Sequence, residues 1–93
     1  MEYDISYWPA ADDAIAELEN DPVMAPVLNA VERVLGRLAK DPFNPRLGTT
    51  AFVTEELGGV SATPVGLDDW YVLWQRGPGP RAIEIVLVHP LRI

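Results

Sequence analysis

Residues 69–93 read DWYVLWQRGPGPRAIEIVLVHPLRI, and they are the most informative part of the sequence for the fold. Two runs rich in β-branched and aromatic residues, 70–76 and 81–89, flank the Gly-Pro-Gly-Pro sequence of residues 77–80. Two such runs around a cluster of turn-forming residues predict an antiparallel β-hairpin. Because neither run alternates cleanly between apolar and polar residues, we expect both faces of the two strands to need cover in the folded protein.

Strand alternation predicts which side chains share a face of this hairpin. In the first strand, we expect one face to carry Trp70, Val72 and Trp74, and the other to carry Tyr71, Leu73 and Gln75. In the second strand, we expect Ile83, Ile85 and Leu87 to lie on the face opposite to Ala82, Val86 and Val88.

The composition is that of one small globular domain spanning residues 1–93. Apolar residues make up 48% of the 93 residues and charged residues 23%, which is enough for one modest core. The chain has no cysteine, so disulfides and thiolate metal sites are excluded, and we expect no metal and no other cofactor. Residues 1–8 contain neither a basic segment nor a long apolar run, so we expect no signal peptide, no membrane association and a cytoplasmic location.

The net charge of −7 is unevenly distributed along the chain. Residues 1–21 contain seven acidic and no basic residues, whereas residues 76–93 contain three arginines and one glutamate. Overall acidity argues against avid, non-specific binding to a nucleic-acid backbone, because such binding depends on many Lys and Arg contacts. A small basic patch near the hairpin remains compatible with the sequence.

The residues before the hairpin predict a strand followed by two helices. Tyr3, Ile5 and Tyr7 alternate with polar residues as in a half-buried strand, and a helix is expected over residues 9–20. Asp21 is expected to cap a second helix that has Pro22 at its first position and ends at Lys40. Its apolar residues recur at helical spacing: Met24, Val27, Leu28, Val31, Leu35 and Leu38.

The segment between the helices and the hairpin contains many Pro and Gly residues. Residues 41–49 are predicted to be a loop, and residues 50–57 to be either a strand or an irregular edge. Gly58 and Gly59 are expected to form a turn before a short strand over residues 60–65. The order is therefore β-α-α-β-β-β, an α+β fold in which a two-helix hairpin packs on one face of a mainly antiparallel sheet. The other face should be bare and should bind a partner or a second copy of the chain.

Three motifs occur within this order of elements. Residues 38–42 (LAKDP), followed by Pro45, look like an "L-x-x-x-P" helix exit. Residues 69–75 (DWYVLWQ) are similar to a "D-Y-R-V-L-Y-R" strand, and residues 83–89 (IEIVLVH) to an "I-x-I-x-x-V-x-H-R" closing strand. Together these motifs resemble the RelE/ParE toxin superfamily, the toxin halves of bacterial type II toxin–antitoxin pairs. The resemblance covers essentially all 93 residues.

The resemblance implies two alternative activities. Members related to RelE cleave messenger RNA on the ribosome, using Lys and Arg of the middle strands and a His or Tyr near the C-terminus. Members related to ParE act on DNA gyrase without a nuclease site. For a nuclease, the catalytic candidates in this chain are His89, Arg81 and Arg92. The candidates for binding RNA or a partner are Arg46, Arg76, Tyr71, Trp70 and Trp74.

The departures from the family pattern favour binding over RNA cleavage. Tyr71 and Gln75 replace arginines of the strand motif, and Pro90 replaces the Arg that follows the histidine. RNA cleavage needs an acid, a base and cations at the phosphate, and the cations are what these positions lack. The sequence therefore predicts a toxin-like protein that acts by protein binding, with a cognate antitoxin and a possible homodimer as partners. A ribosome-dependent endoribonuclease is the alternative, and an interaction domain outside any toxin pair is a third hypothesis.

Overall fold

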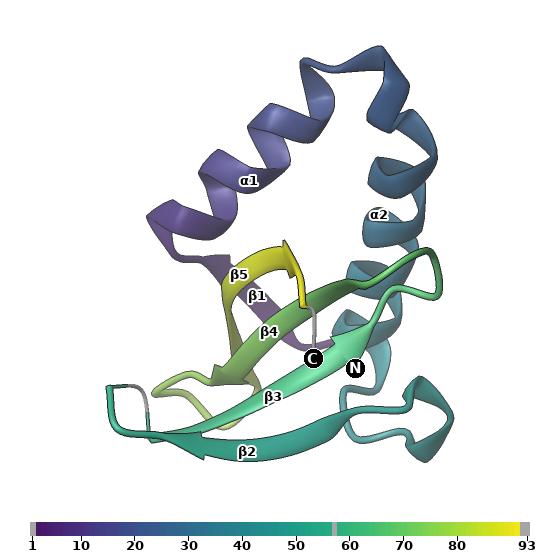
Figure 1. Cartoon of the computed structure of the whole chain (residues 1–93). Helices are drawn as coiled ribbons and strands as arrows, with labels where there is room; N and C mark the ends of the chain where they lie inside the picture. The colour runs from purple at the N-terminus through teal and green to yellow at the C-terminus, as the bar shows by residue number, and fades with distance from the viewer. Residues whose placement is uncertain (1, 57, 92–93) are drawn as a thin grey trace.

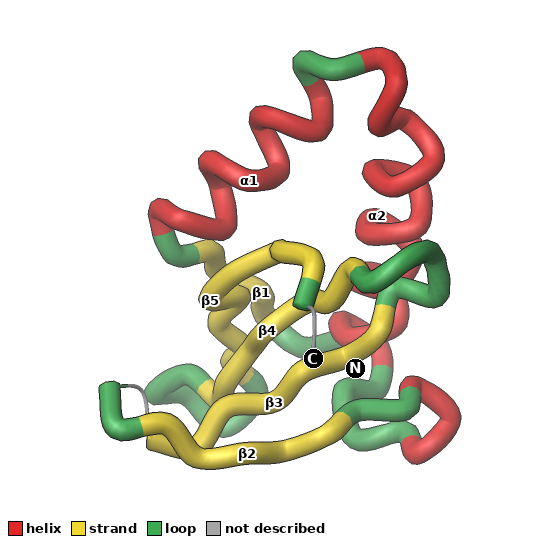
Figure 2. Tube along the Cα trace, in the orientation of Figure 1, coloured by secondary structure: helices red, strands yellow, loops and turns green. Residues whose placement is uncertain are grey.

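The computed structural model describes residues 2–56 and 58–91, and it has two layers, shown in Figures 1 and 2. The helical layer contains α1 (Pro9–Glu19), α2 (Ala25–Lys40) and the short 3₁₀ helix η1 (Pro22–Met24) between them. The five strands are β1 (Asp4–Tyr7), β2 (Thr50–Thr54), β3 (Gly58–Pro64), β4 (Trp70–Arg76) and β5 (Ala82–Pro90). A second 3₁₀ helix, η2 (Pro45–Leu47), interrupts the loop before β2.

The sheet has the order β1-β5-β4-β3-β2. β1 pairs in parallel with β5, and every other neighbouring pair is antiparallel. This arrangement confirms the α+β fold predicted from the sequence. The segment that was predicted to be either a strand or an irregular edge forms a strand, β2, and this strand lies at the edge of the sheet, far from α1 in Figure 1.

The first helix and the end of the second lie as the sequence predicted, but the second helix starts differently. The Asp21 carboxylate accepts a hydrogen bond from the Val23 backbone N–H at 3.1 Å, so Asp21 is the expected cap, but it caps η1. α2 then begins at Ala25 and has Pro26 in its first turn. Because proline has no N–H to bond with the carbonyl four residues earlier, Pro26 prevents one continuous α-helix through residues 22–40.

The prediction of a turn at Gly58 and Gly59 is wrong. Both glycines belong to β3, where they pair with Thr54 and Val53, and Glu55 and Glu56 occupy the turn. Gly58 has a φ of 70°, in the left-handed region. A left-handed glycine at the end of a hairpin turn is a common geometry, so Gly58 both ends the turn and starts the strand.

The helices cover one face of the sheet and enclose the main core. The sheet contributes the buried side chains Val72, Trp74, Ile83, Ile85 and Val88. The helices contribute Ala11, Leu18, Val27, Ala30, Val31, Val34 and Leu38. Alternation along β4 places Val72 and Trp74 on this face, as predicted, and sends Leu73 to the opposite face.

A β-bulge changes the faces of β5. Leu73 pairs with Leu87 and Trp74 pairs with Ile85, so Val86 is an extra residue in the ladder. Leu87 therefore joins the second face, and Val88 joins Ile83 and Ile85 in the main core. The predicted faces of Leu87 and Val88 are thus exchanged. The bulge is not visible in the sequence pattern, because strict alternation assumes one partner for every residue.

The second face of the sheet is less bare than the sequence suggested. Its central side chains Val60, Ala62, Leu73 and Val86 are only 2–8% exposed. Trp8, Tyr71, Leu87 and Leu91 pack around them. The second face, which was predicted to be bare and apolar, is therefore partly covered by side chains of the chain itself. Less of it is available to a partner than predicted.

Replacement of Ile85 by alanine tests which packing holds the layers together. Ile85 is fully buried between the sheet and the helices, so Ile85→Ala should lower the free energy of unfolding by about 2–5 kcal/mol. Val23→Ala is the matched control, because Val23 is 83% exposed and its change should stay within about 0.5 kcal/mol. Urea unfolding followed by circular dichroism measures both. Equal effects of the two substitutions would contradict this assignment of the core.

Candidate functional site

His89 lies exposed near the end of β5, directly opposite Tyr71 of β4. Its ring nitrogen Nδ1 is 2.6 Å from the carbonyl oxygen of Pro90. His89 also lines a pocket of about 370 Å³ between α1 and the ends of β4 and β5. The charged residues lining this pocket are Glu17 and Asp21, and none of its described lining residues is a lysine or an arginine. The surroundings of His89 are therefore acidic, which disfavours a phosphate group.

Arg76 and Arg81 lie at the other end of the β4–β5 hairpin, on aromatic rings. The Arg76 guanidinium carbon is 4.5 Å from the centre of the Phe43 ring, and that of Arg81 is 4.7 Å from the centre of the Tyr3 ring. The Tyr3 and Phe43 rings meet edge to face with their centres 6.2 Å apart. Cation–π contacts of this kind hold both guanidinium groups against the protein. We call Tyr3, Phe43, Arg76 and Arg81 the cation–aromatic cluster.

His89 does not lie close to Arg76 and Arg81 in the structure. Arg81 immediately precedes β5 and His89 is near its end, so seven residues of strand lie between them, roughly 25 Å along the strand. The structure therefore does not assemble His89 and Arg81 into one site. The third catalytic candidate, Arg92, lies outside the described residues.

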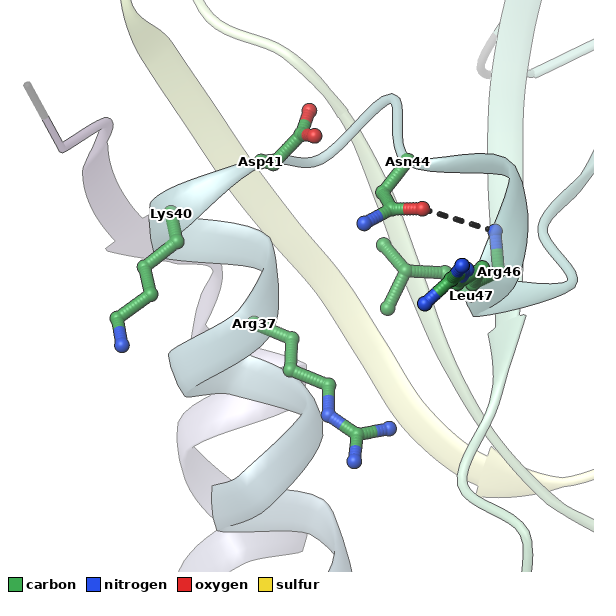
Figure 3. A pocket seen from close by; sticks show the side chains of 6 residues that line it. All are labelled: Arg37, Lys40, Asp41, Asn44, Arg46 and Leu47. Carbon is green, nitrogen blue, oxygen red and sulfur yellow. Dashed lines mark hydrogen bonds between the residues drawn. The ribbon is translucent and has the colours of Figure 1, made fainter.

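A second basic region surrounds Arg46, which is exposed on η2. Arg46 lines a pocket of about 320 Å³ with Arg37, Lys40, Asp41, Asn44 and Leu47. In Figure 3, Arg37 extends from α2 toward Arg46, whereas Lys40 projects from the helix in another direction. The Asn44 side chain accepts a hydrogen bond from the Arg46 backbone N–H at 3.0 Å and so holds the turn that presents Arg46.

Trp74, Trp70 and Tyr71 have different surroundings. Trp74 is 2% exposed, so it is a core residue and offers no free ring face for a nucleic-acid base. Trp70 is half-buried against the main core, and Tyr71 is half-buried in the cluster on the second face. The exposed aromatic ring near the arginines is instead Phe43, which is 49% exposed. No sequence pattern pointed to Phe43, because it is a single apolar residue in a Pro-rich loop.

Comparison with solved structures identifies the architecture. A YoeB/ParE toxin from Agrobacterium tumefaciens superposes with a TM-score of 0.77 at 7% identity, covering 96% of this chain and 99% of that one. The RelE–RelB complex from the archaeon Pyrococcus horikoshii gives a TM-score of 0.69 at 14% identity, with 97% and 96% covered. The RelBE2 toxin–antitoxin complex from Mycobacterium tuberculosis gives 0.64 at 18% identity, with 98% and 100% covered.

The chain has the RelE/ParE toxin fold. No protein-family model matches the sequence, and no curated protein matches it significantly. The likeness is therefore one of architecture: two helices and a five-stranded mixed sheet in the same order along almost the whole chain. Within residues 2–56 and 58–91, neither helix is long and apolar enough to span a membrane.

Buried and half-buried polar side chains of the sheet are paired by hydrogen bonds with one another and with neighbouring residues. The Trp74 indole N–H donates to the Thr63 hydroxyl at 2.9 Å, and the Thr63 and Thr49 hydroxyls are 2.6 Å apart. On the second face, Glu84 accepts hydrogen bonds from the Gln75 amide at 2.8 Å and from the Trp8 indole at 3.4 Å. A charged residue in the middle of an apolar strand thus has two donors, which offset the cost of its partial burial.

Replacement of Trp74 by phenylalanine tests its structural role. Trp74→Phe keeps an aromatic ring but removes the N–H donor to Thr63, and the lost hydrogen bond should cost about 0.5–1.5 kcal/mol of stability. In a Thr63→Val background the acceptor is already absent, so the same change should cost roughly 1 kcal/mol less. Urea unfolding of the four proteins measures this coupling. An identical cost in both backgrounds would show that the hydrogen bond contributes nothing.

Proposed function

We propose that this chain is the toxin-like component of a bacterial type II toxin–antitoxin pair and that it acts by binding a host protein, without nuclease activity. The RelE/ParE toxin fold along 96–98% of the chain supports the first part. The placement of His89 supports the second part. This histidine lies in an acidic pocket with Glu17 and Asp21, at the opposite end of β5 from Arg81.

The chemistry of RNA cleavage explains why that placement carries the argument. Attack by the 2′-hydroxyl needs a proton acceptor at one side of the phosphate and a proton donor at the leaving oxygen. Cations must lie close to the same phosphate to stabilise its developing charge. Among the described residues, the charges that line the His89 pocket are the carboxylates of Glu17 and Asp21, which repel a phosphate, and Arg76 and Arg81 are too far along the hairpin to compensate.

A protein target requires no such convergence of catalytic groups. We propose DNA gyrase, or another host protein, as the target and the cytoplasm as the location. The cation–aromatic cluster is the surface that we assign to target binding. Arg76 and Arg81 are exposed, and aromatic rings hold them in place, so little side-chain entropy is lost when they bind.

A cognate antitoxin is the proposed partner. Two of the similar structures are toxin–antitoxin complexes, RelE–RelB and RelBE2. On this chain, the second face of the sheet offers a partly exposed apolar rim around a buried centre, which includes Tyr71 and Leu87. An antitoxin segment with apolar side chains would complete the cover of that face.

The alternative is a ribosome-dependent endoribonuclease centred on His89. One observation favours it: Tyr71 and His89 are directly opposite each other on the same face of β4 and β5. A tyrosine beside a histidine provides two groups able to exchange protons. In this alternative, the cations that stabilise the phosphate would have to come from outside the described lining of the His89 pocket, for example from the counterions of the ribosome-bound RNA.

Inducible expression in a bacterium, with and without the gene next to this one, tests the proposed function. We expect growth arrest that the neighbouring gene relieves, with messenger RNA intact. The double substitution His89→Ala, Arg76→Ala separates the two functions when compared with His89→Ala alone. If the chain acts by binding a host protein, the His89→Ala variant should stay toxic and the double variant should lose its toxicity. Arg33→Ala, on an exposed position of α2, is the control for loss of a surface arginine.

Three results would contradict the proposal. Cleaved messenger RNA in the wild type that is absent in His89→Ala would establish the nuclease alternative. Normal growth of the bacterium under full expression of the chain would contradict the proposal that it is a toxin. Purified protein that neither traps gyrase on DNA nor retains any host protein would leave no target for the binding mechanism.

A further inference from the structure

β2 forms an edge of the sheet that is not protected against pairing. Among the described residues, β2 pairs with β3 on one side only. Its sequence, Thr-Ala-Phe-Val-Thr over Thr50–Thr54, contains no charged residue and no proline. Val53 is 83% exposed and Phe52 is 37% exposed. Proteins usually protect an edge strand with lysine, proline or a covering segment, because its free backbone groups pair readily with another strand.

We propose that a second copy of this chain pairs with the outer edge of β2, antiparallel and centred on Phe52. The sheets of the two copies would then join into one continuous sheet. This inference is independent of the proposed toxin function, since it depends only on β2 and the residues around it. Figure 1 shows that β2 lies at the edge of the sheet away from α1, with η2 near its start, so α1 does not block the approach.

The sequence of β2 is nearly symmetric about Phe52, as a two-fold contact requires. In the proposed register, Phe52 lies opposite Phe52 of the second copy, and Thr50 lies opposite Thr54 of the second copy. Ala51 lies opposite Val53 of the second copy. Aromatic–aromatic and Thr–Thr pairs across strands are favourable, and no like charges face each other.

The exposed Val53 has a complementary pocket on the other copy. Ala51 lines a pocket of about 450 Å³, together with Phe43, Trp74 and residues of the loop before β2. Because Ala51 and Val53 point to the same face, Val53 of the second copy would stand at the mouth of this pocket. The two-fold axis repeats the contact, so each copy supplies one projecting valine and one pocket. A self-complementary surface of this kind is the signature of an isologous interface.

The charges at the two ends of β2 also complement each other. Glu55 and Glu56 follow the strand and are exposed, whereas the exposed Arg46 precedes it. In an antiparallel pair the end of one strand meets the beginning of the other. Glu56 would then fall opposite Gly48 of the second copy, two residues from its Arg46. Two such opposite-charge contacts per dimer favour this register over a parallel one, which would bring the glutamates of both copies together.

The size of the contact sets its strength. One five-residue strand and two small pockets bury less than the roughly 1,200 Å² found in stable complexes. The dimer should therefore be weak and depend on concentration. Analytical ultracentrifugation of the full chain between about 10 μM and 1 mM should show the average mass rise from that of one chain toward that of two.

Substitution of Val53 by lysine tests the interface. Val53→Lys places a charge at the mouth of the apolar pocket and should abolish the rise in mass over the same concentrations. Val23→Lys is the matched control, because Val23 is also 83% exposed but belongs to η1 in the helical layer. The control should dimerise like the wild type. A chain that stays monomeric throughout, or a Val53→Lys variant that still dimerises, would overturn the proposal.

A cysteine at the centre of the pair gives a second test that does not rely on a weak equilibrium. The chain has no cysteine, so Phe52→Cys introduces a single thiol, which would face its own copy across the axis. Mild oxidation should produce a covalent dimer, and Val23→Cys should not. Equal cross-linking of the two variants would mean random collision and would overturn the register. Loss of binding to the neighbouring gene's product in Val53→Lys, without dimerisation of the wild type, would assign the edge to that protein instead.

Discussion

The structure depends on covering two central strands that are apolar on both faces. β4 and β5 direct Val72, Trp74 and Ile85 to one face and Leu73 and Val86 to the other. If either face stayed in water, the protein would lose the free energy of burial of its side chains, roughly 1.5–3 kcal/mol for each large apolar one. The two-helix hairpin covers the first face, and this requirement is what fixes the helices on the sheet.

Residues that directly follow two strands of the sheet, Trp8 after β1 and Leu91 after β5, help to cover the second face. β1 lies parallel to β5, and the Trp8 backbone N–H donates to the carbonyl of Ile85 at 2.9 Å, which holds the indole near Glu84. After β5, the Leu91 N–H donates to the carbonyl of Asp69 at 2.8 Å, so Leu91 lies beside the start of β4. Trp8 and Leu91 both pack on the second cluster. A small domain thus obtains cover for two faces from only one helical layer.

The same architecture separates the charges of the chain. α1 carries Asp12, Asp13, Glu17 and Glu19 and packs along β5, so the end of β5 that presents His89 is acidic. Arg76 and Arg81 lie at the opposite end of the β4–β5 hairpin from His89, and Arg46 lies on η2, close to Arg37 of α2. Within this fold, the described arginines on aromatic rings lie apart from His89, and this separation is the observation on which our proposal of a binding function rests.

From the sequence alone, the order of the main helices and strands could be predicted, but the start of the second helix and the turn before β3 could not. Hydrophobic periodicity, the Asp21 cap and the Gly-Pro-Gly-Pro turn are local signals, and local signals are what a sequence shows directly. The tertiary structure alone decided the bulge at Val86, which exchanged the faces of Leu87 and Val88. It also decided that Phe43 meets Arg76. These features depend on pairing register and on contacts between residues distant in the chain, and the energy of such contacts is set by the packing of the whole domain, not by any single stretch of residues.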